Sequence, residues 1–61
     1  MTWEELVEKA KYYNCEHYSE NWFDFRGITF WKDGEITCGD EIIAESRTNE
    51  QMYQIMIALE S

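Results

Sequence analysis

The side chains best suited to metal binding or nucleophilic chemistry are Cys15, His17 and Cys38. Two thiolates and an imidazole would supply most of the ligands of a structural zinc site. Such sites usually contain a closely spaced pair of cysteines, and this sequence has no such pair. We therefore expect no metal site and interpret Cys38 as a small core residue and Cys15 and His17 as a solvated segment. Metal analysis would decide the rival hypothesis of a metalloprotein.

A catalytic cysteine needs a stabilised thiolate and a base within reach. Neither cysteine lies at a predicted helix N-terminus or beside a basic cluster, and the surrounding glutamates disfavour the thiolate. Acid–base chemistry by paired carboxylates needs a concave site, which a chain of 61 residues rarely builds. No phosphate-binding loop, dinucleotide motif or nucleophile elbow is present. We expect no enzymatic activity and no cofactor.

The acidic residues are the remaining candidates, because the chain carries 13 of them against 5 basic residues, a formal net charge of −8. Nucleic-acid surfaces and anionic membranes bind Lys and Arg, so this charge argues against direct contact with either. It favours a protein partner with a basic surface, such as the groove of a nucleic-acid enzyme. Solubility alone would also explain the acidity, and that interpretation stays open.

The acidity is uneven along the chain, since residues 33–45 contain five acidic residues and no basic one. These carboxylates gather at two predicted turns. The candidate partner-binding residues are Asp33, Gly34, Glu35, Asp40 and Glu41, with Trp31 as an exposed apolar anchor.

Aromatic residues make up 16% of the chain, a high share for a small domain. They either enlarge a small core or lie exposed as a contact surface. The second alternative predicts a structural or adaptor domain that self-associates through Trp22, Phe23, Phe25 and Trp31. The sequence leaves a monomer and a homodimer equally open.

The first element that positions these residues is a helix predicted over residues 3–13. Thr2 and Glu5 have the spacing of a capping box, and apolar residues then recur at helical spacing. Asn14 is a plausible stop because asparagine tolerates the left-handed conformation. Residues 15–26 are predicted as a loop, in which residues 22–25 are left open as a short strand.

A β-hairpin is predicted over residues 27–38, with its turn at Lys32-Asp33-Gly34. A three-residue loop with Gly34 left-handed pairs Phe30 with Ile36 and Ile28 with Cys38. This register places those four apolar side chains on one face and Thr29, Trp31, Glu35 and Thr37 on the other. Because a one-residue slip would exchange the faces, the coherent apolar face favours this loop.

A third strand is predicted over residues 41–45, after the turn at Gly39-Asp40. Ser46-Arg47 then leads to a second capping box at Thr48 and Gln51, and a helix over residues 49–60. The predicted fold is therefore α+β: a helix, a three-stranded antiparallel sheet and a helix, with both helices packed on one sheet face and the short strand over residues 22–25 left open as an addition to the sheet. The chain of 61 residues forms a single domain.

We expect a cytoplasmic protein without a membrane segment. Residues 1–10 carry three glutamates and no apolar run, which argues against a signal peptide. No stretch approaches the roughly 18 apolar residues of a membrane span. Two cysteines are too few for a secreted disulfide framework.

The order of elements, the Asp33-Gly34 hairpin tip, and the stretch from Ile43-Ala44-Glu45-Ser46 through Asn49-Glu50 resemble the small acidic anti-CRISPR proteins of phages. The resemblance implies a helix, three antiparallel strands and a helix. It also implies DNA mimicry, in which the inhibitor blocks the site where a CRISPR nuclease reads the short motif beside its target. The acidic tip that makes key contacts in that family corresponds to Asp33, Gly34 and Glu35. The expected function is therefore a non-enzymatic acidic protein-binding domain.

Overall fold

The computed structural model describes residues 1–46 and 48–61, so Arg47 in the predicted connection lies outside the described residues. The elements follow in the order α1 (Trp3–Tyr12), β1 (His17–Tyr18), β2 (Trp22–Phe25), β3 (Ile28–Trp31), β4 (Glu35–Cys38), β5 (Glu41–Glu45) and α2 (Asn49–Glu60). The α+β class is confirmed. The sheet, however, has five strands in the order β1-β2-β3-β4-β5 rather than three.

Helix α1 begins at the predicted capping box. The Thr2 hydroxyl accepts from the Glu5 backbone N–H at 3.1 Å, and the Thr2 backbone N–H donates to the Glu5 carboxylate at 2.9 Å. The helix ends at Tyr12, and Asn14 adopts the expected left-handed conformation with φ of 65°. Its buried side chains are Trp3, Leu6 and Ala10.

Helix α2 covers the predicted range. The Thr48 hydroxyl accepts from the Gln51 backbone N–H at 3.1 Å, which satisfies one of the free donors of the first turn. Met52 and Met56 lie one turn apart and are buried against the sheet and α1.

The short strand left open over residues 22–25 is confirmed as β2, but the preceding segment is not all loop, because His17–Tyr18 forms β1 of a β1–β2 hairpin. Tyr18 pairs with Phe23, and the Ser19 N–H donates to the Trp22 carbonyl across the turn at 2.8 Å. Strand β1 has two exposed residues and therefore no alternation of buried and exposed side chains from which to predict it. In β2, Phe23 is buried and Trp22 is less so, as the alternation predicted.

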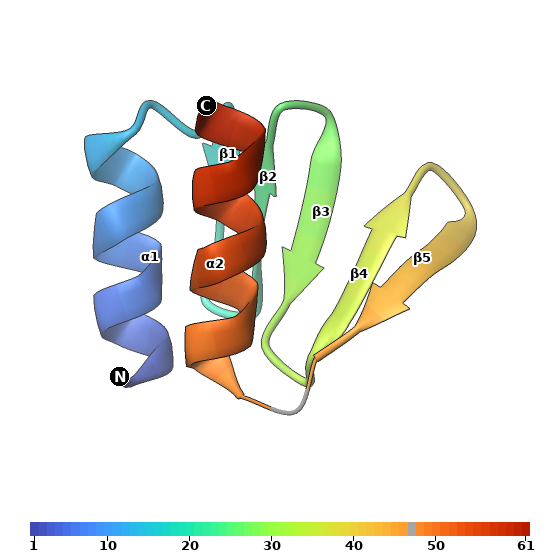
Figure 1. Cartoon of the computed structure of the whole chain (residues 1–61), viewed down its shortest axis with the longest axis horizontal. Coiled ribbons are helices and arrows are strands. Elements are labelled where there is room, and N and C mark those ends of the chain that lie inside the picture. Colours follow the sequence, from blue (N-terminus) through green and yellow to red (C-terminus); the bar gives the residue numbers. More distant parts are fainter. Residues whose placement is uncertain (47) are drawn as a thin grey trace.

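The β3–β4 hairpin has the predicted register. Phe30 pairs with Ile36, the Gly34 N–H donates to the Trp31 carbonyl at 2.9 Å, and Gly34 is left-handed with φ of 100°. The interpretation of Cys38 as a core residue is wrong, because its side chain is exposed. Cys38 ends β4, which extends beyond the cover of the helices (Figure 1).

A bulge interrupts the pairing of β4 with β5. Ile36 pairs with Ala44 and Thr37 with Ile42, so Ile43 is the extra residue of β5. The bulge shifts the alternation, which brings Ile42 to the same face as Thr37 and away from the core. Ile42 and Ile43 are consequently 55% and 50% exposed.

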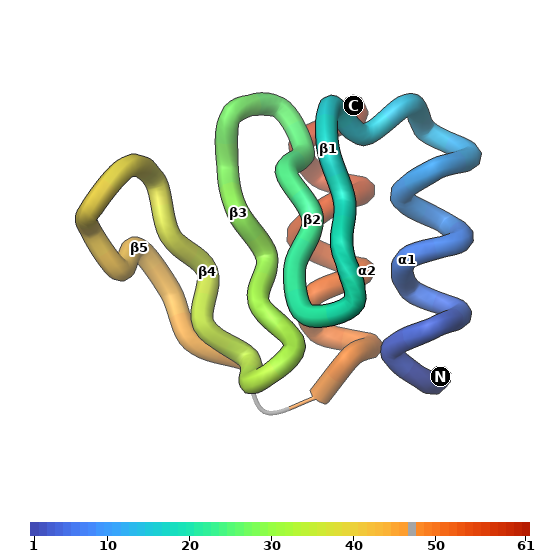
Figure 2. The backbone as a smooth tube through the Cα atoms, turned by 180° about the vertical axis from the view of Figure 1, so that it is seen from behind, coloured from blue at the N-terminus to red at the C-terminus, as the bar shows by residue number. Residues whose placement is uncertain are grey.

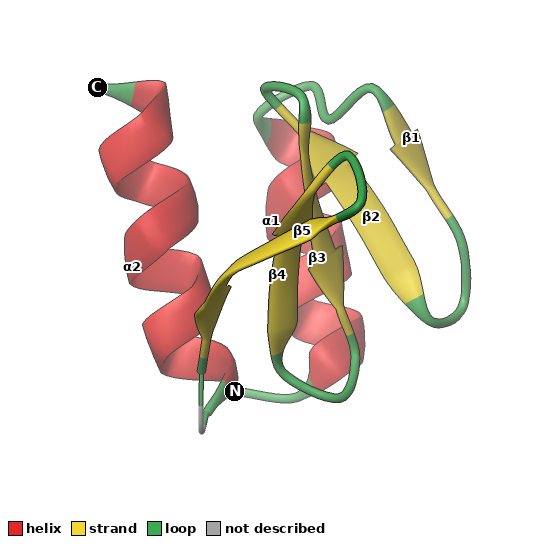
Figure 3. Ribbon diagram, turned by 90° about the vertical axis from the view of Figure 1, so that its right-hand side faces the viewer, coloured by secondary structure: helices red, strands yellow, loops and turns green. Residues whose placement is uncertain are grey.

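The two helices form one layer and the sheet the other (Figures 1 and 3). The core between the layers consists of Trp3, Leu6, Ala10, Phe23, Phe25, Phe30, Ile36, Met52 and Met56. Seen from behind, β1 and β2 lie in front of α2, while the β4–β5 hairpin projects to one side of the helices (Figure 2). One face of the sheet is therefore buried by both helices, and the opposite face has no such cover.

Candidate functional site

We call the sheet face opposite the helices the outer face. Its residues either alternate with core-facing residues along a strand or lie directly opposite another outer-face residue on the neighbouring strand. They are His17, Trp22, Asp24, Thr29, Trp31, Glu35, Thr37, Ile42 and Glu45. An uncovered sheet face with two tryptophans and three carboxylates is the most distinctive surface of the described chain.

Two side-chain hydrogen bonds hold the centre of the outer face. The Thr29 hydroxyl donates to the Asp24 carboxylate at 2.5 Å, and the Trp31 indole N–H donates to the Thr37 hydroxyl at 2.9 Å. Each bond joins neighbouring strands, so it fixes the rotamers of both partners. The Trp31 ring is thereby held against the sheet instead of rotating freely in solvent.

Trp22 and Trp31 form an aromatic pair on this face. They are direct cross-strand partners, with ring centroids 6.4 Å apart and planes inclined by 52°. Trp31 is 37% exposed, so part of its ring can contact another molecule. Tryptophan side chains that are held in place and exposed are common anchors of protein interfaces.

Glu35 and Glu45 lie directly opposite each other on β4 and β5. Like charges in this arrangement destabilise a sheet, because each carboxylate raises the energy of the other. Among the described residues, the outer face carries no Lys or Arg that would offset this repulsion. A positively charged group from another molecule would relieve it.

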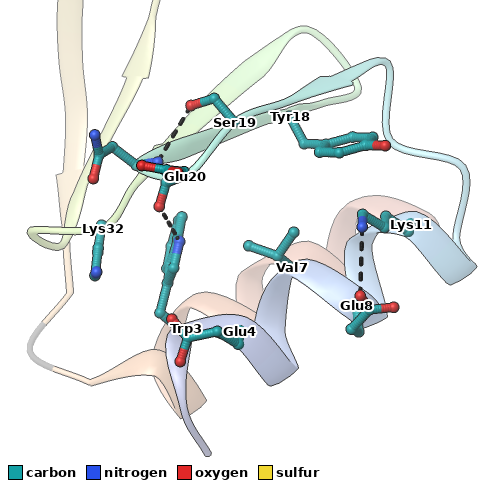
Figure 4. A pocket seen from close by; sticks show the side chains of 10 residues that line it. Trp3, Glu4, Val7, Glu8, Lys11, Tyr18, Ser19, Glu20 and Lys32 are labelled. Atoms are coloured by element: carbon teal, nitrogen blue, oxygen red, sulfur yellow. Dashed lines mark hydrogen bonds and ion pairs between the residues drawn. The ribbon is translucent and has the colours of Figure 1, made fainter.

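The described cations lie elsewhere. Lys9 and Lys11 belong to α1. Arg26 lies in the turn between β2 and β3 and donates to the Glu60 carboxylate of α2 at 2.7 Å. Figure 4 shows the Lys32 side chain beside Trp3, on the side of the sheet where the helices lie. The described lysines therefore lie on the helix side of the molecule, whereas the outer face of the sheet carries carboxylates without them.

The structure places the predicted tip residues in different roles. The Asp33 carboxylate accepts from the Glu35 backbone N–H at 3.1 Å, so Asp33 shapes the turn. Gly34 is buried, and its carbonyl accepts from the Ser46 N–H at 2.8 Å. Gly34 is consequently part of the scaffold, whereas Glu35 and Trp31 belong to the outer face.

Asp40 and Glu41 lie at the opposite end of β4 from Asp33 and Gly34 (Figure 1). A strand rises about 3.3 Å per residue, so a distance of roughly 17 Å separates the two turns. The predicted acidic residues therefore form two separate groups instead of one cluster.

Cys15, His17 and Cys38 are not brought together. His17 is in β1 and Cys38 in β4, with two strands between them in the sheet. No three metal-ligating side chains cluster anywhere in residues 1–46 and 48–61. Burial, followed by the nearby Glu16 carboxylate, raises the pKa of the Cys15 thiol, which disfavours the nucleophilic thiolate. Cys15 is partly buried and packs against the core, so its interpretation as part of a solvated segment is wrong, whereas His17 is exposed as expected.

A second surface feature, which the sequence did not predict, is an open depression of about 630 Å³ between α1 and the β1–β2 turn (Figure 4). The Trp3 indole N–H donates to the Glu20 carbonyl at 2.9 Å and closes one end. At the other end, Lys11 lies 3.4 Å from the Glu8 carboxylate and 4.4 Å from the centre of the Tyr18 ring. Because lysines already neutralise part of its charge, this depression is less suited to a cationic partner than the outer face.

Comparison with protein-family models, with curated proteins and with solved structures found no match to this chain. Within the described residues, neither helix has the length and apolar character that crossing a membrane requires.

Proposed function

We propose that this chain is a non-catalytic domain that binds a basic surface of another protein through the outer face of its sheet. The observation that carries the proposal is the combination of the Trp22–Trp31 pair with the opposed Glu35 and Glu45 carboxylates. An arginine of the partner would stack on an exposed tryptophan ring and donate hydrogen bonds to a carboxylate at the same time.

Mimicry of DNA is the finer form of this proposal. The five acidic residues in residues 33–45 would take the place of phosphates in the basic groove of a nucleic-acid-binding protein, with a CRISPR effector nuclease as one such partner. The separation of the two acidic turns implies two contacts along such a groove. Competition with duplex DNA for a purified CRISPR effector nuclease tests this form, and undiminished DNA binding at saturating concentrations of the chain would refute it.

The broader proposal can be tested with a model ligand. The probe is a blocked peptide in which arginine alternates with glycine, because the glycines disfavour strand formation. We expect saturable quenching of tryptophan fluorescence at low salt, and an affinity that falls as salt is added. Trp31→Ala should weaken binding about tenfold, and Glu35→Gln about threefold to fivefold, as for a partly exposed charge contact.

Glu4→Gln provides the matched control, since it removes the same charge from the α1 side of the molecule, where Glu4 lines the open depression. This variant should bind the peptide within about twofold of the wild-type affinity. Equal losses in Glu4→Gln and Glu35→Gln would refute the outer face as the binding surface, because only the net charge would then matter.

Self-association through aromatic residues is the second candidate function, and the structure changes the residues involved. Phe23 and Phe25 are fully buried, so they cannot form the contact. Trp22 and Trp31 remain on the outer face, but a second copy would bring another set of the same carboxylates to it. Light scattering after size-exclusion chromatography decides between the candidates: we expect a monomer, and a dimer dissociated by Trp31→Ala would favour self-association.

A further inference from the structure

Two half-exposed isoleucines of β5 lie beside the tryptophan and the carboxylates of the outer face. Ile42 pairs with Thr37, which belongs to this face. Ala44 packs against the core, so the preceding residue, Ile43, lies on the other side of the strand, as Ile42 does. The two isoleucine side chains are 55% and 50% exposed. The β-bulge therefore places an aliphatic surface, which we call the isoleucine pair, on the uncovered side of the sheet.

The isoleucine pair and the carboxylates form one surface over β3, β4 and β5. Glu45 follows Ile43 by two residues, which corresponds to about 7 Å along the strand. From Trp31 on β3 to Glu45 on β5 there are two strand spacings, or about 10 Å. An α-helix is about 10–12 Å wide and rises about 5.4 Å per turn. In the described chain no element covers this surface, which therefore has the width of one helix (Figure 2).

A helix suits this surface better than an extended segment does. A segment lying extended on a sheet face would leave its own backbone N–H and carbonyl groups without partners, which costs free energy. A helix pairs these groups internally and offers a continuous apolar stripe. The polar groups beneath such a stripe have partners within the face. The Thr29 hydroxyl donates to Asp24, and the Thr37 hydroxyl accepts from Trp31, so covering them costs little.

The charges of the chain make a second copy a poor occupant of this surface. Residues 33–45 contain five acidic residues and no basic one, so two such surfaces would bring like charges together. Helix α1 carries Lys9 and Lys11, but its buried apolar residues belong to the core, so it cannot dock on another molecule. Helix α2 contains no basic residue. A foreign helix with arginine one turn from its apolar residues is complementary in charge and in hydrophobicity.

We propose that the outer face over β3, β4 and β5 binds an amphipathic α-helix of a partner protein. Apolar residues of this helix pack on the isoleucine pair and Trp31, and arginines one turn further along reach the Glu35 and Glu45 carboxylates. The bound helix forms a third layer on the free face of the sheet. This inference rests on the proposed function and specifies the kind of basic partner that the outer face takes.

The test compares two blocked, alanine-based peptides of about 16 residues, a length at which helices begin to form in water. In the one-face peptide, leucines at positions i and i+3 and arginines at i+4 and i+7 share one helix face. In the two-face peptide, the arginines stand at i+6 and i+9, opposite the leucines. Both peptides have the same composition and charge. We expect the one-face peptide to quench tryptophan fluorescence with an affinity at least about tenfold higher. Proline at i+5 of this peptide, which breaks the helix, should remove the advantage.

Variants of the chain locate the contact. Ile42→Thr and Ile43→Thr should each weaken the one-face peptide about threefold or more and leave the glycine-spaced arginine peptide within about twofold. Both side chains are half exposed, so the variants should fold. Tyr12→Gln is the matched control, because it removes exposed apolar surface from α1 instead. It should bind the one-face peptide within about twofold of the wild-type affinity.

The two peptide classes separate failure of this inference from failure of the proposed function. If neither the glycine-spaced arginine peptide nor the one-face peptide bound, both proposals would fall. If the glycine-spaced peptide bound at the outer face while the one-face and two-face peptides bound equally, only the helical partner would be refuted. Undiminished binding of the one-face peptide by both isoleucine variants would likewise overturn this inference alone.

Discussion

At the scale of single residues, Glu35 and Glu45 hold two like charges opposite each other, an arrangement that costs stability. A positively charged group of a partner that bound between the two carboxylates would offset this cost. Function and stability should then respond in opposite directions to substitutions here.

Glu45→Lys should stabilise the isolated domain by about 0.5–1 kcal/mol, because a repulsive cross-strand pair becomes attractive. The midpoint of urea unfolding measures the change. Glu20→Lys, in the exposed β1–β2 turn, alters the net charge equally and serves as the control. If both variants gained the same stability, the local repulsion between Glu35 and Glu45 would be absent.

Gly34→Ala should destabilise the domain by about 2–4 kcal/mol. A Cβ at Gly34 would lie 2.3 Å from the Ser46 carbonyl oxygen, and the backbone has φ of 100°. Gly39→Ala is the matched control, because Gly39 is also left-handed but has no atom within 4 Å of the added Cβ. It should cost about 1 kcal/mol. Similar losses in the two variants would contradict the close approach of Ser46 to Gly34.

At the scale of elements, the N-terminus of α1 should be sensitive to acid. Hydrogen bonds with Thr2, first from its backbone N–H and then from its side chain, lower the pKa of Glu5 from its ordinary value in the folded state. A lowered pKa contributes stability above the unfolded pKa, and this contribution is lost as the pH falls through the folded value. Glu5→Gln should therefore lose less stability than the wild type between pH 6 and pH 3, as measured by urea unfolding. An identical loss would contradict the capping role of Glu5.

The elements that were predicted correctly carry local signals. Thr2 and Thr48 mark helix starts, because the side chain of each accepts a hydrogen bond from the backbone N–H three residues further on. Gly34 marks a hairpin whose register follows from the loop length. Strand β1 was missed because two exposed residues carry no pattern. Cys38 was placed on the correct strand, but the sequence does not show where the cover of the helices ends.

The candidate site was predicted in part, for a similar reason. Trp31 and Glu35 flank the turn and were identified from local sequence. Their partners, Trp22 and Glu45, lie on other strands, and their positions depend on the registers of β2 and β5. The bulge at Ile43 shifts the register of β5 against β4. No residue type in β5 predicts this bulge. Non-local pairing therefore completes the site.

At the scale of the whole molecule, the net charge of −8 is large for 61 residues. Self-repulsion of this charge opposes the compact state, and added salt screens it. Raising sodium chloride from about 20 mM to about 500 mM should therefore increase the free energy of unfolding by up to about 1 kcal/mol. A decrease would mean that exposed ion pairs such as Arg26–Glu60 contribute more than the repulsion does.

In the proposed function the same charge would attract a basic partner, and its distribution would decide where that partner docks. The outer face combines carboxylates with tryptophans and lacks a described Lys or Arg, whereas the α1 side contains Lys11, which pairs with Glu8, and Lys32. A basic ligand should therefore recognise one layer of the molecule in preference to the other.

Chemical-shift mapping with the glycine-spaced arginine peptide tests this central claim most directly. We predict that the largest shifts fall on the indole N–H resonances of Trp22 and Trp31 and on the amides of Glu35 and Glu45. Shifts concentrated around Glu4 and Glu8 in the α1 depression, or spread evenly over the surface, would contradict the assignment of the outer face as the binding site.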